Sequence, residues 1–223
     1  MKVSEALDTR LTCRAFTDQP VPQEMIKEII EKSARAPSGG NLQPWHVHAI
    51  AGDVKDELIK RVREQMPEKP MGEGAEYDIY PKELKNPYEA RRRDIGERMY
   101  GTLEIPKEDR GKRIAWFMKN FEFFNAPVAL VFSIDKQMGE GQWSDLGMYI
   151  QSLMLLAREY GLHTCPQEAW AMWQGTIRDL LDIPEERMVF CAVGIGYMDE
   201  DHVVNTLRSP RAPLEEYCQF SGF

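Results

Sequence analysis

Two arginines and a hydroxyl stand at alternate positions near the start of the chain, Arg10, Thr12 and Arg14. If this segment is extended, the three side chains project to the same side, because alternate residues of a strand share a face. Arginine stays charged at any working pH, and its planar fork binds phosphate bidentately. The spacing therefore allows a phosphate site. A solvated basic edge of the protein is the alternative.

A second polar segment, residues 37–45 (Pro-Ser-Gly-Gly-Asn-Leu-Gln-Pro-Trp), follows a predicted helix. Gly39 and Gly40 permit backbone torsions closed to other residues and let a ligand approach closely. Asn41 and Gln43 carry donors and acceptors, which match the alternating polar edge of a flavin pyrimidine ring. The alternative is an ordinary turn between a helix and a strand, where the same residue types are common.

Two later segments could also contact a ligand. Within residues 165–170 (Cys-Pro-Gln-Glu-Ala-Trp), an exposed backbone amide could donate to a flavin N5. A polar connection between two helices is the alternative there. Arg208 and Arg211 lie beside prolines in the last part of the chain, where arginines are usually surface residues.

The elements that position these residues follow from the spacing of apolar side chains. Helical periodicity predicts helices over 22–36, 54–65, 89–100, 113–124 and 145–160. Short apolar runs predict strands over 46–51, 128–134 and 189–197, with a short strand or a loop at 163–166. The helix over 145–160 is apolar nearly all round and is expected at the centre. This order favours an α+β fold with one sheet.

The chain of 223 residues is long enough for a sizeable core, and we predict a single domain over 1–223. Residues 66–110 are rich in Pro and Gly and lack a strong apolar stripe, so we interpret them as an excursion from the core. Residues 205–223 end in Tyr217, Phe220 and Phe223. Isolated tails rarely carry such aromatics, so this tail is expected to dock on another surface.

Composition excludes several classes of function. The net charge of −8 argues against binding to nucleic acid or to an anionic membrane surface. The four cysteines are scattered without a CxxC pair, which argues against disulfides and a zinc site and fits a reducing cytoplasm. His46 and His48 lack further ligands for a metal. No GxGxxG, P-loop or GxSxG motif is present. The first residues lack the apolar run of a signal peptide, so we expect a cytoplasmic protein.

Taken in their order along the chain, these segments resemble the nitroreductase family. The resemblance lies in the N-terminal arginines, the Ser-Gly-x-Asn loop before Trp45, the Pro-x-Glu segment at 166–168 and the arginines of the tail. Residues 121–127 (Phe-Glu-Phe-Phe-Asn-Ala-Pro) and 142–147 (Gln-Trp-Ser-Asp-Leu-Gly) are most similar to the branch of nitrobenzoate-type reductases. The resemblance covers nearly the whole chain and is weakest over 66–110.

The resemblance implies a nitroreductase-like fold, in which helices flank a central mixed or antiparallel sheet and two chains intertwine as a homodimer. It implies bound FMN, with NAD(P)H as the electron donor and a nitroaromatic or quinone-like small molecule as the acceptor. Hydride would pass in two steps through flavin N5, without a catalytic side chain. Residues 66–110 would lie near the acceptor pocket, and the tail over 205–223 would wrap the partner subunit.

The resemblance also implies roles for single residues. Arg10, Arg208 and Arg211 would neutralise the FMN phosphate, with Thr12 adding a hydroxyl, and Arg14 would face N1 and O2 as electrostatic support. Serine is more common than threonine at position 12, and some members carry glycine where this chain has Ala169. The partner subunit would supply the loop over 37–41, and residues 166–168 would line the other ring face. The full predicted FMN-binding set is Arg10, Leu11, Thr12, Arg14, Pro37, Ser38, Gly39, Asn41, Pro166, Gln167, Glu168, Arg208 and Arg211.

Three other functions fit parts of this pattern. One is a reductive dehalogenase or flavin-consuming enzyme of the same superfamily. Another is a non-catalytic flavin-binding protein, and a third is a structural homodimer without a cofactor. The sequence leaves open the physiological acceptor, the choice between NADH and NADPH, and reactivity with oxygen.

Overall fold

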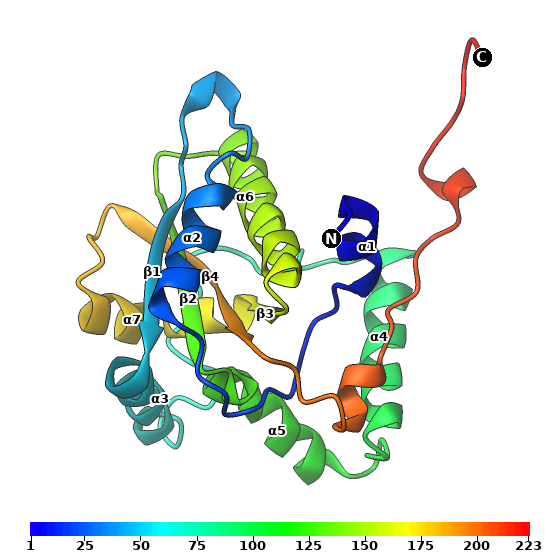
Figure 1. Ribbon diagram of the computed structural model, residues 1–223. Coiled ribbons are helices and arrows are strands. Elements are labelled where there is room, and N and C mark those ends of the chain that lie inside the picture. The colour runs from blue at the N-terminus through cyan, green and yellow to red at the C-terminus, as the bar shows by residue number, and fades with distance from the viewer.

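The computed structural model describes all residues, 1–223, and is built around one sheet (Figure 1). Its strands are β1 (His46–Ala51), β2 (Val128–Asp135), β3 (His163–Gln167) and β4 (Arg187–Gly196). They lie in the order β1-β2-β4-β3, and every neighbouring pair is antiparallel. The structure therefore confirms the α+β class and selects the antiparallel sheet from the two arrangements predicted.

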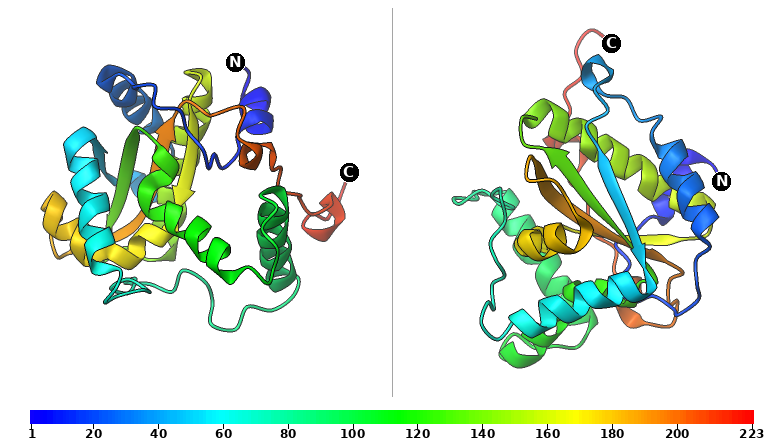
Figure 2. Two further views of the ribbon diagram at one scale, coloured as in Figure 1. Left: turned by 90° about the horizontal axis from the view of Figure 1, so that it is seen from below. Right: turned by 90° about the vertical axis from the view of Figure 1, so that its left-hand side faces the viewer.

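The central strand β2 is buried on both faces, as its continuous apolar run predicts. Leu130 and Phe132 belong to the core shared with α2 (Gln23–Ser33) and α6 (Glu140–Glu159). Ala129 and Val131 belong to the opposite core, shared with α3 (Gly52–Gln65) and α7 (Gln174–Leu181). Alternate side chains point to opposite faces of a strand, so one strand serves both layers (Figure 2).

The central helix α6 is buried on one side only. Leu146, Tyr149 and Leu153 are buried against the sheet, whereas Gly147 and Met148 are exposed. The sequence makes this helix apolar nearly all round, but packing within one chain covers only one side of it. No helix of the protein, α6 included, is long and apolar enough to cross a membrane.

The helix predicted over 113–124 is wrong in its last part. α5 covers Arg110–Met118, and a 3-10 segment over Lys119–Asn125 follows it. Phe123 and Phe124 have left-handed φ values of 51° and 52°, which cannot continue a right-handed helix. Burial holds them there, because Phe123 is fully buried and stacks on Trp170 at a centroid distance of 4.2 Å.

Two further elements were not predicted, and the structure decides between the strand and the loop predicted at 163–166 in favour of the strand. α1 (Val3–Thr9) and α7 are short and were not predicted. Residues 163–167 form the edge strand β3, so the alternative of a polar connection between two helices is wrong for the first part of the 165–170 segment. Pairing with β4 decides this, since Cys165 pairs with Gly194. The segment is too short for its sequence pattern to identify it as a strand.

Residues 66–87 cross one side of the molecule before α4 (Tyr88–Thr102), which stands apart from the sheet (Figure 2). The excursion is held largely by polar contacts. The Glu73 carboxylate accepts hydrogen bonds from the Thr176 amide at 3.0 Å and the Thr176 hydroxyl at 2.9 Å. Glu76 pairs with Arg178 at 2.9 Å. Polar contacts of this kind account for an ordered segment without an apolar stripe.

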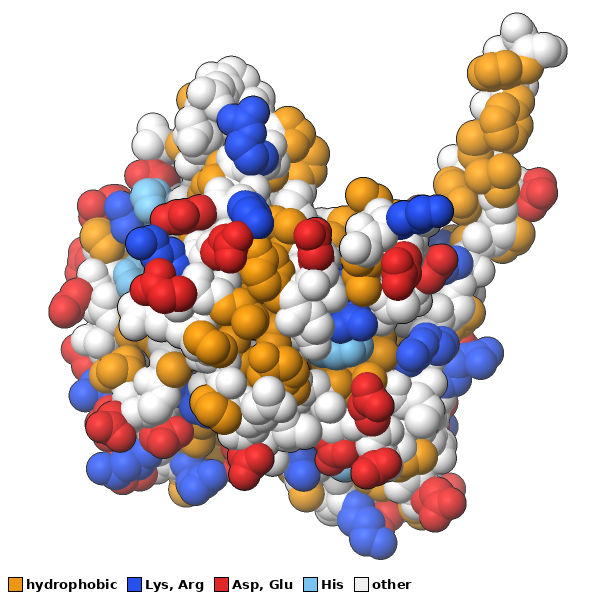
Figure 3. Space-filling view, viewed as in Figure 1, with side chains coloured by type: hydrophobic (Ala, Val, Ile, Leu, Met, Phe, Trp, Pro, Cys, Tyr) orange, Lys and Arg blue, Asp and Glu red, His pale blue; other side chains and the backbone are white.

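The C-terminal tail leaves the body of the chain after a short 3-10 turn over Val203–Thr206 (Figures 1 and 3). Its aromatic side chains are largely uncovered, with Tyr217 71% and Phe220 68% exposed. A second 3-10 turn, Leu214–Glu216, is tied to α4 through an ion pair between Glu216 and Arg91. A single chain therefore offers the tail aromatics no surface to dock on.

Gly196 on β4 provides a test of this packing. A Cβ atom there would lie 2.5 Å from Cδ of Pro127, closer than real contacts allow, and 3.2 Å from Cδ1 of Phe16, which is a tight contact. We expect Gly196→Ala to lower the free energy of unfolding by about 1–3 kcal/mol, the usual cost of overpacking. Urea unfolding followed by circular dichroism measures the difference.

Gly101→Ala on α4 is the matched control, because a Cβ there meets nothing within 4 Å. It should leave stability unchanged or raise it by up to about 1 kcal/mol, because alanine favours helix over glycine. Equal urea midpoints for wild type and Gly196→Ala would contradict the packing described.

Candidate functional site

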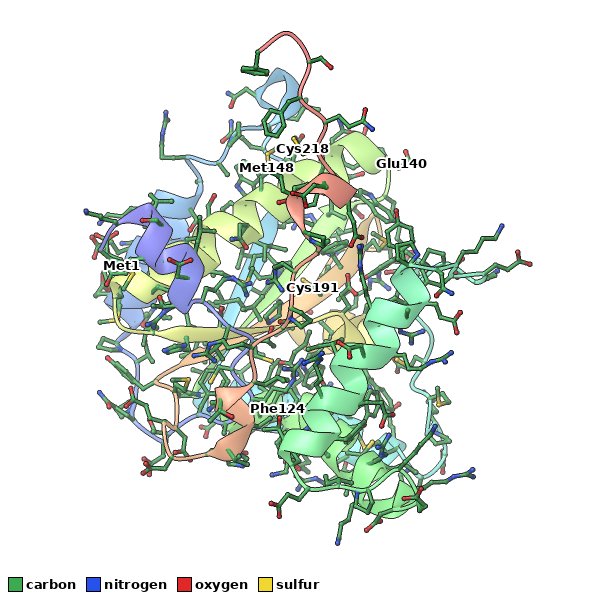
Figure 4. All side chains as sticks on the ribbon, turned by 90° about the vertical axis from the view of Figure 1, so that its right-hand side faces the viewer. Met1, Phe124, Glu140, Met148, Cys191 and Cys218 are labelled. Carbon is green, nitrogen blue, oxygen red and sulfur yellow. The ribbon has the colours of Figure 1, made fainter.

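Two cavities lie on the side of the molecule that carries α4. One, the arginine cavity, has a volume of about 620 Å³ and is lined by Arg10, Leu11, Thr12, Arg14, Arg208 and Arg211 among others. The other, the apolar cavity, measures about 680 Å³ and includes Pro166, Gln167, Glu168, Ala169 and Cys191 in its wall. A third cavity shares Arg92 with the apolar cavity and Arg211 with the arginine cavity, so the three adjoin. Figure 4 looks at this side, with Cys191 labelled.

The arginine cavity brings together residues from both ends of the chain. The segment 10–14 runs beside β3, where Thr12 forms a parallel bridge with Thr164 and the Cys13 amide donates to the Thr164 carbonyl at 2.9 Å. Cys13 is fully buried, whereas Arg10, Thr12 and Arg14 line the cavity. The extended alternation expected from the sequence is therefore present.

The tail arginines are held at the cavity by backbone contacts. A guanidinium N–H of Arg208 donates to the Asn205 carbonyl at 2.9 Å, and one of Arg211 donates to the Ser209 carbonyl at 3.0 Å. Asn205 also fixes the other end of the chain, because its Oδ1 accepts from the Arg14 amide at 2.9 Å. Asn205 is buried and joins the two arginine segments.

No ion pair neutralises these arginines. None of the four lies within 4.0 Å of a carboxylate oxygen, although Asp8 lines the same cavity. Desolvation, aided by repulsion from Arg211, lowers the pKa of Arg10 below its usual value, yet guanidinium remains charged at working pH. Four uncompensated cations around one cavity favour an anionic ligand, and phosphate matches their geometry best.

The apolar cavity contains the end of β3 and the start of the 3-10 segment Glu168–Trp173. Gln167 is buried, and its side-chain nitrogen donates to the Asn120 carbonyl at 2.7 Å. Its side-chain oxygen is buried without a hydrogen-bond partner. An orphaned acceptor beside a mainly apolar wall suits a flat ring with polar edges, because such a ring buries its faces and offers donors at its rim.

The ionisable groups of the apolar cavity do not suggest a nucleophile or a general base. Burial raises the pKa of the Cys191 thiol far above its usual value, so the reactive thiolate is not available. The Glu168 side chain is exposed at the wall, but nearby protein atoms crowd its carboxyl and raise its pKa by desolvation. The chemistry of this cavity must therefore come from a bound group.

The loop over 37–41 lies elsewhere in the chain. Gly39 donates its amide to the carboxylate of Asp145 at 3.1 Å, and Asp145 lies in the first turns of α6. The arginine segment lies near the other end of that helix, where Arg158 donates to the Thr9 hydroxyl at 3.3 Å. These two helix positions are about 20 Å apart at 1.5 Å per residue. Pro37, Ser38, Gly39 and Asn41 therefore line neither cavity of their own chain.

The loop itself has a backbone conformation that lets a ligand approach it closely. Gly40 and Asn41 both have φ values of 58°, in the left-handed region. The Ser38 hydroxyl accepts from the Gln43 amide at 3.0 Å, which fixes the turn. The Asn41 side chain makes no hydrogen bond within the chain and is exposed.

Sequence reasoning missed several residues of the site. Asn205 was treated only as part of the tail, and Asn120 and Gln151 were not singled out, although they line the two cavities. Within the excursion, Tyr80 lines the apolar cavity, whereas Tyr77 stacks on Phe190 and donates to its carbonyl at 2.6 Å. A side chain from a polar loop gives no pattern that marks it, so only the folded arrangement identifies these residues.

The residues present fit FMN. Four unpaired arginines and a threonine offer donors for a phosphate, and the adjoining apolar cavity offers a wall and an unsatisfied acceptor for a ring. A phosphate and an aromatic ring in adjoining cavities are what a flavin mononucleotide requires.

Comparison with known proteins agrees with this geometry. The family model described as "Nitroreductase family" matches residues 7–197. A 4-nitrobenzoate reductase of Pseudomonas putida is 36% identical, with 96% of this chain and 93% of that protein covered. A chloronitrobenzene nitroreductase of Comamonas testosteroni is 31% identical over 98% of this chain and 96% of its own.

A solved structure is similar over its whole length. The FMN and NADPH-dependent nitroreductase NfnB from Sphigopyxis sp. strain HMH superposes with a TM-score of 0.97 at 41% identity, with all of both chains covered. A family model over most of the chain, together with relatives of this identity and coverage, establishes the family. The chain belongs to the nitroreductase family.

Proposed function

We propose that this protein is an FMN-dependent oxidoreductase that uses NAD(P)H to reduce nitroaromatic or quinone-like acceptors. The observation that carries the proposal is the cluster of four unpaired arginines beside an apolar cavity, in a chain whose relatives are nitroreductases. When bound, FMN supplies a carrier that takes a hydride from NAD(P)H at N5 and passes it to the acceptor.

The protein's own residues bind the flavin, orient it and adjust its electron affinity. Arg10, Arg208 and Arg211 hold the phosphate, whose negative charge offsets the repulsion between Arg10 and Arg211. Arg14 faces the N1–O2 edge, where a fixed positive charge stabilises negative charge that develops during reduction. The mainly apolar wall of the other cavity limits water at the reacting ring.

We also propose that the working unit is a homodimer with a site made from both chains. The loop over 37–41 lines neither cavity of its own chain, so it serves a flavin through a second copy. Met148 on α6 is 39% exposed, and Val3 and Leu7 on α1 are 71% and 51% exposed, which leaves an apolar face for that copy. The exposed tail aromatics wrap the partner subunit.

Reductive dehalogenation and non-catalytic flavin binding predict different spectra and turnover. Purified protein should be yellow, and anaerobic NADPH or NADH should bleach the flavin band. Nitroaromatics should then restore it, whereas halophenols should not. A flavin that neither nicotinamide bleaches would support a binding protein, and a colourless protein that takes up no FMN would sink the proposal.

Removing a phosphate arginine should weaken FMN binding. A charge-assisted hydrogen bond contributes about 1.5–3 kcal/mol, so Arg10→Gln or Arg211→Gln should raise the dissociation constant of FMN roughly 10- to 100-fold. Fluorescence titration of the apoprotein measures this. Arg63→Gln is the control, because Arg63 pairs with Glu122 at 2.9 Å away from both cavities, and it should bind FMN as wild type does.

Arg14→Gln should change the electron affinity of the flavin more than its binding. Loss of the charge at N1–O2 should make the two-electron potential more negative by roughly 30 mV or more, because 30 mV corresponds to about 1.4 kcal/mol in such a couple. Arg14→Lys should restore part of the difference. Equal potentials in wild type and Arg14→Gln, measured by dye equilibration, would show that Arg14 has no such role.

A heterodimer tests whether two chains share one site. Arg10→Glu damages the arginine cavity, and Asn41→Leu damages the loop, so each homodimer should bind FMN poorly. Co-expression with two affinity tags yields a heterodimer that carries one intact site, which should hold about half the FMN of wild type. A heterodimer as empty as its parents would mean that both elements serve the same chain's flavin.

A further inference from the structure

Arg92 is the one charged side chain of α4 without an ion pair. Every other charged residue of this helix has a partner: Glu89 with Arg93, Asp94 with Arg98, Glu97 with Arg113, and Arg91 with Glu216. The three consecutive arginines at 91–93 thus have different environments. An unpaired cation in a helix that otherwise neutralises its charges is a candidate for ligand binding.

Helix geometry explains how neighbouring arginines reach different surroundings. Successive residues of an α-helix point about 100° apart, so 91, 92 and 93 cannot share a face. Arg91 pairs with the tail and Arg93 pairs along the helix with Glu89. Arg92 instead lines the apolar cavity.

The guanidinium of Arg92 is held in place without being neutralised. Its Cζ lies 3.9 Å from the ring centroid of Tyr80, which also lines the apolar cavity. Cation–π stacking orients the planar group but uses none of its N–H donors. The fork therefore remains available for a carboxylate.

The rest of the cavity wall leaves the Arg92 guanidinium unpaired. Glu168 is the only other charged residue in it, and it makes no ion pair with Arg92. The amides of Asn120 and Gln167 hydrogen-bond within the protein, since Gln167 donates to the Asn120 carbonyl at 2.7 Å and Asn120 donates to the Phe117 carbonyl at 2.7 Å. An acceptor that enters this cavity meets a mainly apolar surface, the Glu168 carboxyl and one unpaired cation, Arg92.

We propose that Arg92 binds the carboxylate of the acceptor and makes carboxylated nitroaromatics better substrates than uncharged ones of the same size. The proposal rests on the function proposed above for this site. Tyr80 is a positioning residue that keeps the guanidinium at the cavity wall. Phosphate groups of the nicotinamide donor are the other anions that could reach Arg92, and the experiment separates the two.

The experiment compares two acceptors that differ in charge, 4-nitrobenzoate and 4-nitrobenzyl alcohol, with FMN-loaded enzyme. Arg92→Gln should lower the ratio of their kcat/KM values about tenfold, mainly through KM for 4-nitrobenzoate, because a charge-assisted bond is lost. Arg92→Lys should recover part of the ratio. Arg93→Gln, which changes the neighbouring charge on the same helix, should keep the ratio of wild type.

A binding measurement makes the test independent of turnover. Benzoate is titrated into the oxidised FMN-loaded protein, and the dissociation constant is obtained from the change in flavin absorbance. Arg92→Gln should raise this constant about tenfold, and Tyr80→Leu should raise it less. If wild type bound benzoate through Arg92 but reduced no nitroaromatic, the proposed function would fail and the assignment of Arg92 would stand.

Two results would overturn the assignment. One is an unchanged acceptor ratio together with an unchanged benzoate constant in Arg92→Gln. The other is a rise in KM for NADPH, without a rise for NADH or 4-nitrobenzoate, which would assign Arg92 to the phosphate of the donor. Circular dichroism and flavin content of each variant exclude misfolding as the cause.

Discussion

Repulsion among four arginines is the constraint on which the rest of the site depends. An acidic chain of net charge −8 gathers Arg10, Arg14, Arg208 and Arg211 at one cavity and leaves them without carboxylate partners. Arg10 is partly buried, and desolvation together with repulsion from Arg211 lowers its pKa, so the charged arrangement persists only if the surrounding structure is stiff enough. The buried Asn205, bonded to both arginine segments, supplies much of that stiffness.

The same segments explain why the two ends of the chain must meet. Residues 10–14 run along β3, and the tail reaches them only after β4 has completed the sheet. An anion that binds both segments therefore stabilises the folded state over any state in which either end is loose, in proportion to its concentration over its dissociation constant. The ion pair of Arg91 with Glu216 extends this link to α4, so the arginine cavity, the wall of the apolar cavity and the tail form one connected unit.

Local patterns predicted the parts of this fold that local interactions decide. β1 over His46–Ala51 was predicted to the residue, and the apolar run of β2 indicated burial on both faces. The left-handed turn at Phe123 and Phe124 could not be predicted, because stacking on Trp170 holds it. The choice between a strand and a loop at 163–166 stayed open, because pairing with β4 decides it. The grouping of Arg10 with Arg211 came from the family resemblance, and spacing alone does not bring residues 201 positions apart together.

The arginines at 91–93 show the same limit in a sharper form. In the sequence they are three equal charges within a polar excursion, and nothing in their spacing separates them. They differ in their partners, which lie before, within and far beyond α4. Arg92 stacks on Tyr80, Arg93 pairs with Glu89, and Arg91 pairs with Glu216. An arginine without an ion-pair partner can bind a ligand, and only the folded chain shows which of the three has no such partner. In this protein the free one, Arg92, lines the apolar cavity.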